Sequence, residues 1–267
     1  MSETPTDAAI RDGLETRSKT VTLEGTGPVF VEAGPRAVLM LHGWGASPES
    51  LRFIAAGVAG SGYSVFVPTL PGHGTSAQDM TATGPLDWVT ASRHALRWLF
   101  DRFGPVFVVG VSMGGTLALQ MAALDPALVA GVAVVNAPLV LMQAQFAIDL
   151  MSGPAEELLP AWHGPTFVGP SVEEITYPER SRKSGVDLLA MAALAREVLP
   201  RVAAPLLILQ SVQDPVVPKD NAEMIRAQAG SRSKRIVWLL NSLHASQLDL
   251  DRDEIVRLVV EFISPLV

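Results

Sequence analysis

The 267-residue sequence contains no cysteine, and its basic residues are outnumbered by acidic ones. The lack of cysteine excludes disulfide bonds and thiolate metal sites, which is typical of proteins in a reducing compartment. With 20 lysines and arginines against 27 acidic residues the net charge is −7, and this argues against nucleic-acid binding. An apolar leader is also lacking, because residues 1–20 are polar and charged, so we expect an N-terminal tail and no secretory signal.

Two apolar stretches, 104–124 and 127–151, are long enough to suggest membrane helices. The first contains a glycine-rich turn, and the second is interrupted by Asn136 and Pro138, so we interpret both as buried strands with the segments that follow them. The hydrophobic content of 48% predicts a large core. We therefore expect a soluble, cytoplasmic protein with no integral membrane segment; whether it is a monomer or a homodimer stays open.

Short β-branched runs alternate with helical patterns along most of the chain. This alternation predicts an α/β fold, with a mostly parallel sheet of about eight strands covered by helices on both faces. The predicted strands lie at 21–24, 29–32, 37–41, 63–67, 106–110, 129–135, 206–209 and 235–240. The predicted helices lie at 48–60, 85–103, 114–124, 185–198, 219–229 and 252–264. We expect the first two strands to form a hairpin at the edge of the sheet.

Residues 138–183 interrupt this alternation, because prolines repeatedly separate their apolar residues and exclude another strand and helix unit. The chain is thereby divided into a core, residues 21–137 and 184–267, and a small cap insertion. Since the insertion follows the C-terminal end of a strand, where α/β sheets bind ligands, we predict a lid over a substrate cavity. The alternative is that its apolar residues only pack it against the core.

The strand at 106–110 ends in Gly110-Val111-Ser112-Met113-Gly114 and leads into an Ala- and Leu-rich helix. A Gly-x-Ser-x-Gly turn in this setting holds its serine in a strained conformation and leaves no space for side chains on either side. The hydroxyl then projects above the sheet, near the N-terminal end of the helix. The pattern predicts that Ser112 is a nucleophile.

A serine hydroxyl needs a base to take its proton, and the base needs a carboxylate to fix its tautomer. His244 follows the last predicted strand, so its loop leaves the sheet at the same edge as Ser112. Asp214 follows the strand at 206–209, whereas its rival Asp220 lies in the first turn of a helix, where the helix dipole explains an acid. We therefore predict a catalytic triad of Ser112, Asp214 and His244.

The remaining histidines do not occupy the position that the base requires. His42 and His73 lie in glycine-rich loops ahead of the nucleophile, and we expect both to be structural. His94 lies within a predicted helix, and His163 lies in the insertion. Since no cluster of His, Asp and Glu has the spacing of metal ligands, we predict no metal site and no cofactor.

A serine that attacks a carbonyl also needs hydrogen-bond donors for the oxygen that becomes negative. One predicted donor of this oxyanion hole is the backbone N–H of Met113, next to Ser112. The second is the N–H of Trp44, because Gly43 and Gly45 let that loop turn toward the site. The Trp44 indole either packs in the core or lines the acyl pocket.

Residues that could bind the substrate come from the same loop and from the insertion. Those in the insertion are apolar and would face a hydrophobic part of the substrate. The candidates are Gly43, Leu139, Met142, Phe146 and Trp162.

Together these motifs resemble the α/β-hydrolase superfamily over about residues 20–265. The resemblance is carried by His42-Gly43-Trp44, Pro71-Gly72-His73-Gly74, the turn at Ser112, Asp214 and His244. Within the superfamily, the chain is most similar to the small bacterial carboxylesterases related to monoacylglycerol lipases. Two further runs carry that similarity, Thr83-Gly84-Pro85-Leu86-Asp87-Trp88 and Leu248-Asp249-Leu250-Asp251.

The resemblance implies a serine carboxylesterase that hydrolyses hydrophobic esters, with short or medium acyl chains or monoacylglycerols, through an acyl-enzyme on Ser112. Thioesterases, acyltransferases, carbon–carbon bond hydrolases and perhydrolases use the same constellation, so these reactions stay open. Dehalogenases and epoxide hydrolases are disfavoured because they need a carboxylate in place of this serine. A ligand receptor without turnover is the non-enzymatic alternative. The family usually has glycine before its histidine, and we expect Leu243 to shift the loop or narrow the pocket.

Overall fold

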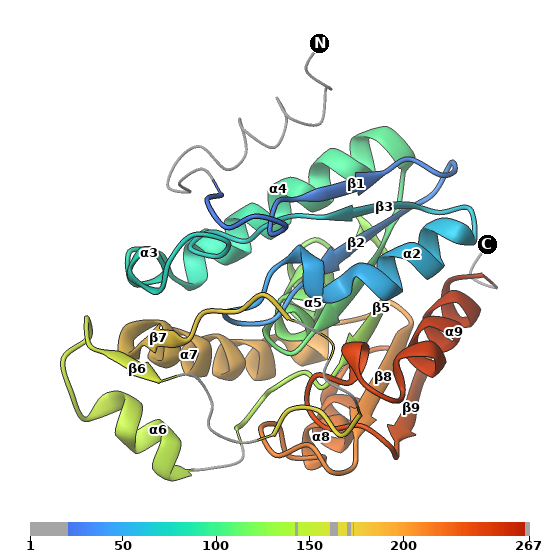
Figure 1. Cartoon of the computed structure of the whole chain (residues 1–267). Helices are drawn as coiled ribbons and strands as arrows, with labels where there is room; N and C mark the ends of the chain where they lie inside the picture. The colour runs from blue at the N-terminus through green and yellow to red at the C-terminus, as the bar shows by residue number, and fades with distance from the viewer. Residues whose placement is uncertain (1–20, 142–143, 161–164, 170–171, 173, 265–267) are drawn as a thin grey trace, which may run out of the picture.

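A computed structural model describes residues 21–264 except 142–143, 161–164, 170–171 and 173 (Figure 1). Its centre is a seven-stranded sheet in the order β1-β3-β2-β4-β5-β8-β9. Neighbouring strands are parallel except for β1 and β3, which are antiparallel. The strands are β1 (Val29–Val31), β2 (Ala37–Leu41), β3 (Ser64–Val67), β4 (Val106–Val111), β5 (Val129–Val135), β8 (Leu206–Ser211) and β9 (Lys234–Leu239).

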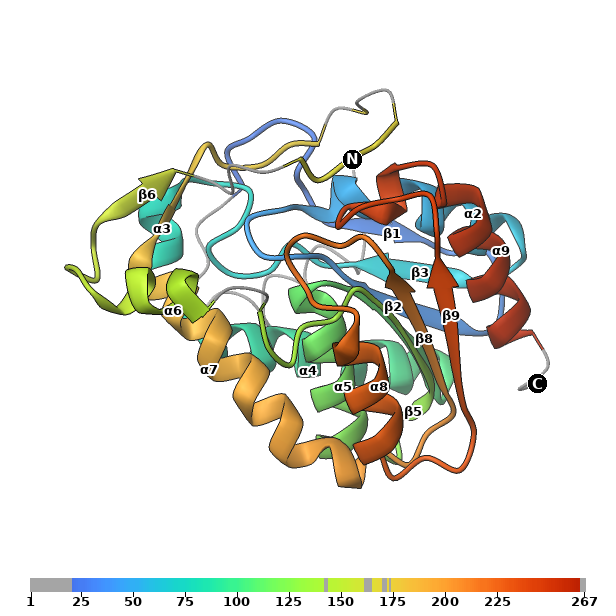
Figure 2. The same cartoon turned by 90° about the horizontal axis from the view of Figure 1, so that it is seen from below.

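Helices cover both faces of this sheet (Figures 1 and 2). The helices on one face are α2 (Arg52–Gly60) and α9 (Arg252–Ile263); those on the other are α4 (Pro85–Phe103), α5 (Met113–Leu124), α7 (Arg182–Val198) and α8 (Asp220–Gln228). Successive side chains of β2 alternate between the two cores: Val38 and Met40 pack with α2 and α9, and Leu39 and Leu41 pack with α4 and α5. Burial on both faces explains why this strand is apolar throughout.

The short elements lie in the connections. They are α3 (Ala77–Thr81) and the 3-10 helices η1 (Pro48–Leu51), η2 (Leu199–Arg201) and η3 (Ser246–Leu248). Helix α3 is not among the predicted helices; it begins where the Ser76 hydroxyl accepts a hydrogen bond from the Asp79 N–H at 3.2 Å.

The predicted α/β architecture is confirmed, with seven strands in the sheet rather than about eight. The expected strand at 21–24 is wrong. The Thr22 and Leu23 N–H groups both donate to the Gly74 carbonyl, and the Thr26 hydroxyl donates to the Leu23 carbonyl, which closes a turn. Because this segment pairs with a loop instead of a strand, the expected edge hairpin does not form, and β1 pairs with β3.

The insertion forms a small layer of its own beside α7 (Figures 1 and 2). Its elements are α6 (Ala144–Met151) and the antiparallel strands β6 (Leu158–Pro160) and β7 (Glu179–Ser181). Tyr177 ties it to the core, since its hydroxyl accepts a hydrogen bond from the Thr75 N–H at 2.7 Å and donates to the Gly72 carbonyl at 3.0 Å. In the described residues the insertion adds no strand to the central sheet, although it contains a helix and two short strands that the sequence does not predict.

Candidate active site

Ser112 occupies a strained position between the end of β4 and the start of α5. Its φ is 52° and its ψ is −123°, a conformation that costs on the order of 1–3 kcal/mol and persists only where the surroundings enforce it. A methyl group on Gly110 would overlap the backbone of Gly114, and one on Gly114 would overlap the Leu41 carbonyl. The predicted tight turn is confirmed, and it presents the Ser112 hydroxyl at the C-terminal edge of the sheet.

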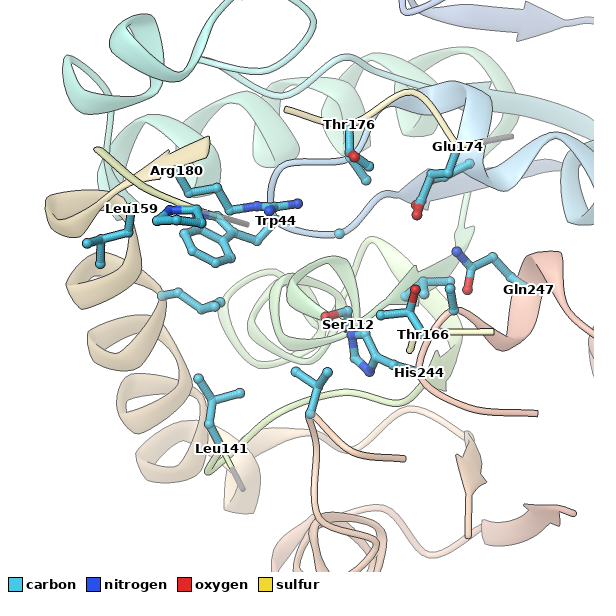
Figure 3. A pocket seen from close by; sticks show the side chains of 18 of the residues that line it. Trp44, Ser112, Leu141, Leu159, Thr166, Glu174, Thr176, Arg180, His244 and Gln247 are labelled. Atoms are coloured by element: carbon cyan, nitrogen blue, oxygen red, sulfur yellow. Dashed lines mark hydrogen bonds between the residues drawn. The ribbon is translucent and has the colours of Figure 1, made fainter. Parts of the chain in front are cut away.

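The structure brings Ser112, His244 and Asp214 into one hydrogen-bonded series (Figure 3). The His244 Nε2 lies 3.0 Å from the Ser112 Oγ, and its Nδ1 lies 2.8 Å from the Asp214 Oδ2. The other Asp214 oxygen accepts hydrogen bonds from the N–H groups of Val216 and Val217, at 2.8 and 2.9 Å. The aspartate is therefore buried and fixed, and the histidine between them can accept a proton from the serine.

The structure also shows where Asp220, the alternative carboxylate, and Leu243, the residue before the histidine, lie. Asp220 is exposed at the start of α8, so it does not compete with Asp214. Leu243 neither separates His244 from its two partners nor stands among the described residues that line the cavity. An effect of Leu243 on the loop or on the width of the pocket stays a prediction.

The loop after β2 lies directly against the nucleophile. A methyl group on Gly43 would sit 3.5 Å from the Ser112 Cβ and 4.0 Å from its Oγ. Met113 is the first residue of α5, so its N–H is one of the N-terminal donors that lack an acceptor within the helix. Trp44 follows Gly43; it lines the cavity and also packs against the core, so the structure does not separate the two alternatives for its ring. Donation to an oxyanion by Trp44 and Met113 stays a prediction.

A cavity of about 460 Å³ opens above Ser112 and His244, in the size range of ligand-binding pockets. One side of the cavity is apolar and the other is polar, and Figure 3 shows the two sets of residues on opposite sides of Ser112. The apolar side contains Leu141, Leu150, Leu159, Pro160 and Leu188. The polar side contains Thr166, Glu174, Thr176 and Gln247. Arg180 spans the upper wall above Trp44.

The predicted substrate-binding residues have mixed outcomes. Gly43 lines the cavity. The prediction that Leu139 binds the substrate is wrong, because its side chain is buried in the main core with the strands and α5. Met142 and Trp162 lie outside the described residues, and so does the side chain of Phe146 in α6.

Glu174 and Arg180 are not predicted from the sequence, although they are charged residues of the cavity wall in the part of the chain that the structure describes. Burial raises the pKa of Glu174, and the neighbouring His244 and Arg180 oppose that rise. Burial lowers the pKa of Arg180, and Glu174 opposes that fall. The Arg180 guanidinium lies 5.1 Å from the centre of the Trp44 ring and packs on Gly45, whose φ of 75° and missing side chain make room for it. No local sequence signal marks either residue, because their burial arises from the fold of the insertion.

His42, the first residue after β2, and His73 are both buried and structural, as predicted. The His42 Nδ1–H donates to the Gly43 carbonyl at 3.0 Å, and its Nε2 accepts from the Leu70 N–H at 3.1 Å. Burial lowers the pKa of His42 to about 4. Burial also lowers the pKa of His73 well below its usual range, and the His42 ring packs edge-on against it at 4.9 Å. Both imidazoles are therefore neutral at pH 7.

Neither a metal site nor a membrane span is found in the part of the chain that the structure describes. No group of three or more His, Asp or Glu side chains there has the arrangement of metal ligands. Nor is any described helix both long and apolar enough to cross a membrane.

The fold and the site together define a class of enzyme in which a serine, a histidine and an aspartate meet at one edge of a mostly parallel sheet. The sequence profile of the alpha/beta hydrolase family matches residues 38–258. The chain belongs to the α/β hydrolase family.

Several characterised proteins are similar to this chain over nearly its whole length. The thermostable monoacylglycerol lipase of Bacillus sp. (strain H-257) is 36% identical over 249 residues, which are 90% of this chain and 95% of that protein. A carboxylesterase of Bacillus subtilis (strain 168) is 24% identical over 248 residues, covering 90% and 96%. The solved structure reported for the metagenome-derived lipolytic enzymes LipS and LipT superimposes with a TM-score of 0.86 at 36% identity, covering 91% of this chain and 99% of that one.

Proposed function

We propose that Ser112 is the nucleophile of a serine carboxylesterase, with His244 as its general base and Asp214 as the residue that orients the base. The family and its named relatives make the chain an ester-hydrolysing enzyme. The observation that carries the serine mechanism is the series of hydrogen bonds from Ser112 through His244 to the buried Asp214, on the floor of a cavity.

In the proposed reaction, His244 takes the Ser112 proton while the serine oxygen attacks the ester carbonyl. The backbone N–H groups of Trp44 and Met113 would hold the oxygen that becomes negative. The protonated His244 then gives its proton to the leaving alcohol, which leaves an acyl group on Ser112. A water molecule, deprotonated by His244, releases the acid and restores the serine.

The two sides of the cavity support a monoacylglycerol-like substrate. The apolar side, with Leu141, Leu150 and Leu159, can enclose a hydrocarbon chain. The polar side, with Glu174 and Gln247, can hydrogen-bond the hydroxyl groups of a small polyol. An ester that places its carbonyl at Ser112 would thus have its acyl chain on one side and its alcohol on the other.

The insertion at 138–183 supplies most of both sides, which supports its role as a lid that selects the substrate. Leu141, Leu150 and Leu159 belong to it, and so do Glu174 and Arg180. In this arrangement the core provides the chemistry and the insertion provides the walls.

The test compares Ser112→Ala with Ser92→Ala on monoacylglycerols and on p-nitrophenyl esters of increasing chain length. Ser92 is the control serine, because it is fully buried outside the site and donates to the Trp88 carbonyl within α4. We expect Ser112→Ala to lose hydrolysis by at least about 10³-fold with an unchanged fold, and Ser92→Ala to retain it. Substantial activity in Ser112→Ala would refute the mechanism. A thioester hydrolysed faster than every ester would refute the substrate class.

A further inference from the structure

Asn136 lies at the centre of the three strand ends that carry the proposed triad. It follows β5 directly, its side chain is fully buried, and its φ is 49°. Asparagine tolerates this left-handed conformation better than most residues, because its short amide can hydrogen-bond locally. A buried polar group in a strained position requires strong local partners to offset its cost.

The Asn136 amide binds two segments far apart in the sequence. Its Oδ1 accepts a hydrogen bond from the Ser211 N–H at 2.7 Å, at the end of β8. Its Nδ2 donates to the His244 carbonyl at 2.8 Å. The same nitrogen lies 3.1 Å from the Ser211 hydroxyl and 3.2 Å from the Ser246 hydroxyl.

The chemistry of these partners allows only one orientation of the amide. A backbone N–H can only donate, so it must face the oxygen, and a carbonyl can only accept, so it must face the nitrogen. The Asn136 amide, held in one orientation, therefore links the end of β8 to the loop that carries His244.

The sheet alone does not place His244. The pairing of β8 with β9 ends at Ser211 and Leu239, and the histidine lies five residues further along. Asp214 likewise follows the end of β8. Since Ser211 and His244 meet at the Asn136 amide, this side chain sets the distance between the loops that carry the acid and the base.

The backbone beside Asn136 completes the link to the nucleophile. The Ser112 N–H donates to the carbonyl of Val135 at 2.8 Å, and the Asn136 N–H donates to that of Leu209 at 2.9 Å. We propose that Asn136 is a positioning residue for the triad, an inference that rests on the proposed function. It holds His244 at the right distance from Ser112 and Asp214.

The test uses two isosteric substitutions, Asn136→Asp and Asn221→Asp. Asn221 is the matched control, because it too is fully buried, and its amide partners among the described residues are the backbones of Leu139, Val140 and Pro218. Asn136→Asp places a carboxylate oxygen against the His244 carbonyl, which pushes the histidine away. We expect kcat to fall on the order of 10²-fold with KM nearly unchanged, the cost of a small misplacement of catalytic groups. Asn221→Asp should keep both constants.

Two further readouts separate positioning from general damage. The rate at which a fluorophosphonate labels Ser112 should fall by the same factor as kcat in Asn136→Asp. The downfield ¹H NMR signal of the His244 Nδ1–H, hydrogen-bonded to Asp214, should move or vanish in that variant and stay in Asn221→Asp. If Asn136→Asp does not fold, Asn136→Gly, which accepts the positive φ and lacks the amide, should show the same loss of kcat.

Equal losses of kcat in the two aspartate variants would overturn the positioning role, and so would a wild-type kcat in Asn136→Gly. These results are distinct from a failure of the proposed function, which would appear in the unsubstituted enzyme as no labelling of Ser112.

Discussion

At the scale of single residues, the nucleophile depends on neighbours that have no side chain. Gly110 and Gly114 are in contact with backbone atoms that cannot move without breaking β2 or α5. Ser112 keeps its strained conformation because this packing leaves the turn no other path. The packing of the sheet and the helix on either side thus compensates for the strain at Ser112.

A methyl group tests this directly. Gly114→Ala should lower the free energy of unfolding by about 1–3 kcal/mol or more, because the new Cβ overlaps the Leu41 carbonyl. Gly60→Ala, at the end of α2 where a methyl group meets open space, should raise it by about 0.4–1 kcal/mol. Urea unfolding of the two variants would measure both; equal stability would contradict the packing argument.

Glu174 should determine the preference for a polyol ester. Replacing it with glutamine keeps the size but weakens its acceptance of hydroxyl hydrogen bonds. We expect the ratio of kcat/KM for a monoacylglycerol to that for the methyl ester of the same acid to fall about tenfold in Glu174→Gln. The methyl ester is the internal control, since it has no hydroxyl group to lose. A ratio that does not change would remove Glu174 from substrate recognition.

The proposed triad can be predicted from the sequence, because each member lies at or shortly after the end of a strand and parallel strands bring their C-terminal ends to one edge. Ser112 also lies in a motif whose glycines are visible. Glu174 and Arg180 cannot be predicted in this way, since an isolated acid and base in an irregular segment have the pattern of surface residues. Asn136 stands out in the sequence only as an interruption of an apolar run.

At the scale of elements, polar contacts attach the insertion to the core at several points, and Asp249 makes two of them with the N–H groups of Val168 and Gly169. Tyr177 makes one of them, bridging the Gly72 carbonyl and the Thr75 N–H next to the buried His73. The insertion itself is predictable from its prolines, but β6 and β7 are not, because their pairing joins residues about twenty positions apart. The strand expected at 21–24 fails for a similar reason: its partner is the loop at Gly74.

Tyr177→Phe should loosen the insertion without touching the chemistry. Loss of the hydroxyl leaves the buried Thr75 N–H without that partner, at a cost of about 1–3 kcal/mol. We expect KM for a monoacylglycerol to rise while kcat for a short p-nitrophenyl ester stays the same.

The other tyrosine provides the control. Tyr63 donates to the Ile263 carbonyl at 3.3 Å, on the face of the sheet covered by α2 and α9. Tyr63→Phe should change stability and leave KM unaltered. If both variants raised KM equally, the insertion would not be anchored through Tyr177.

At the scale of the whole molecule, the buried histidines should make the fold sensitive to acid. His42 and His73 stay neutral when folded, because burial lowers the pKa of His42 to about 4 and that of His73 well below its usual 6.5. Below pH 6.5 the unfolded chain therefore binds protons that the folded chain does not, and stability falls until the folded pKa is reached. Glu174, with its raised pKa, acts in the opposite direction, as one group against two.

For His42 alone, moving from pH 7 to pH 5 should cost about 2 kcal/mol of unfolding free energy. Urea unfolding at the two pH values would measure it. His94→Gln, which changes an exposed histidine on α4, should show the same loss. Equal stability at the two pH values would show that the buried imidazoles are not linked to folding.

The central claim is an acyl-enzyme on Ser112, and rapid mixing with excess p-nitrophenyl ester tests it most directly. If deacylation is slower than acylation, as we expect for a small activated ester, a burst of p-nitrophenol should equal the enzyme concentration. Mass spectrometry of acid-quenched enzyme should then find one acyl group, on the peptide that contains Ser112, and none in Ser112→Ala. An acyl group on another residue, or continued turnover by Ser112→Ala, would contradict the account.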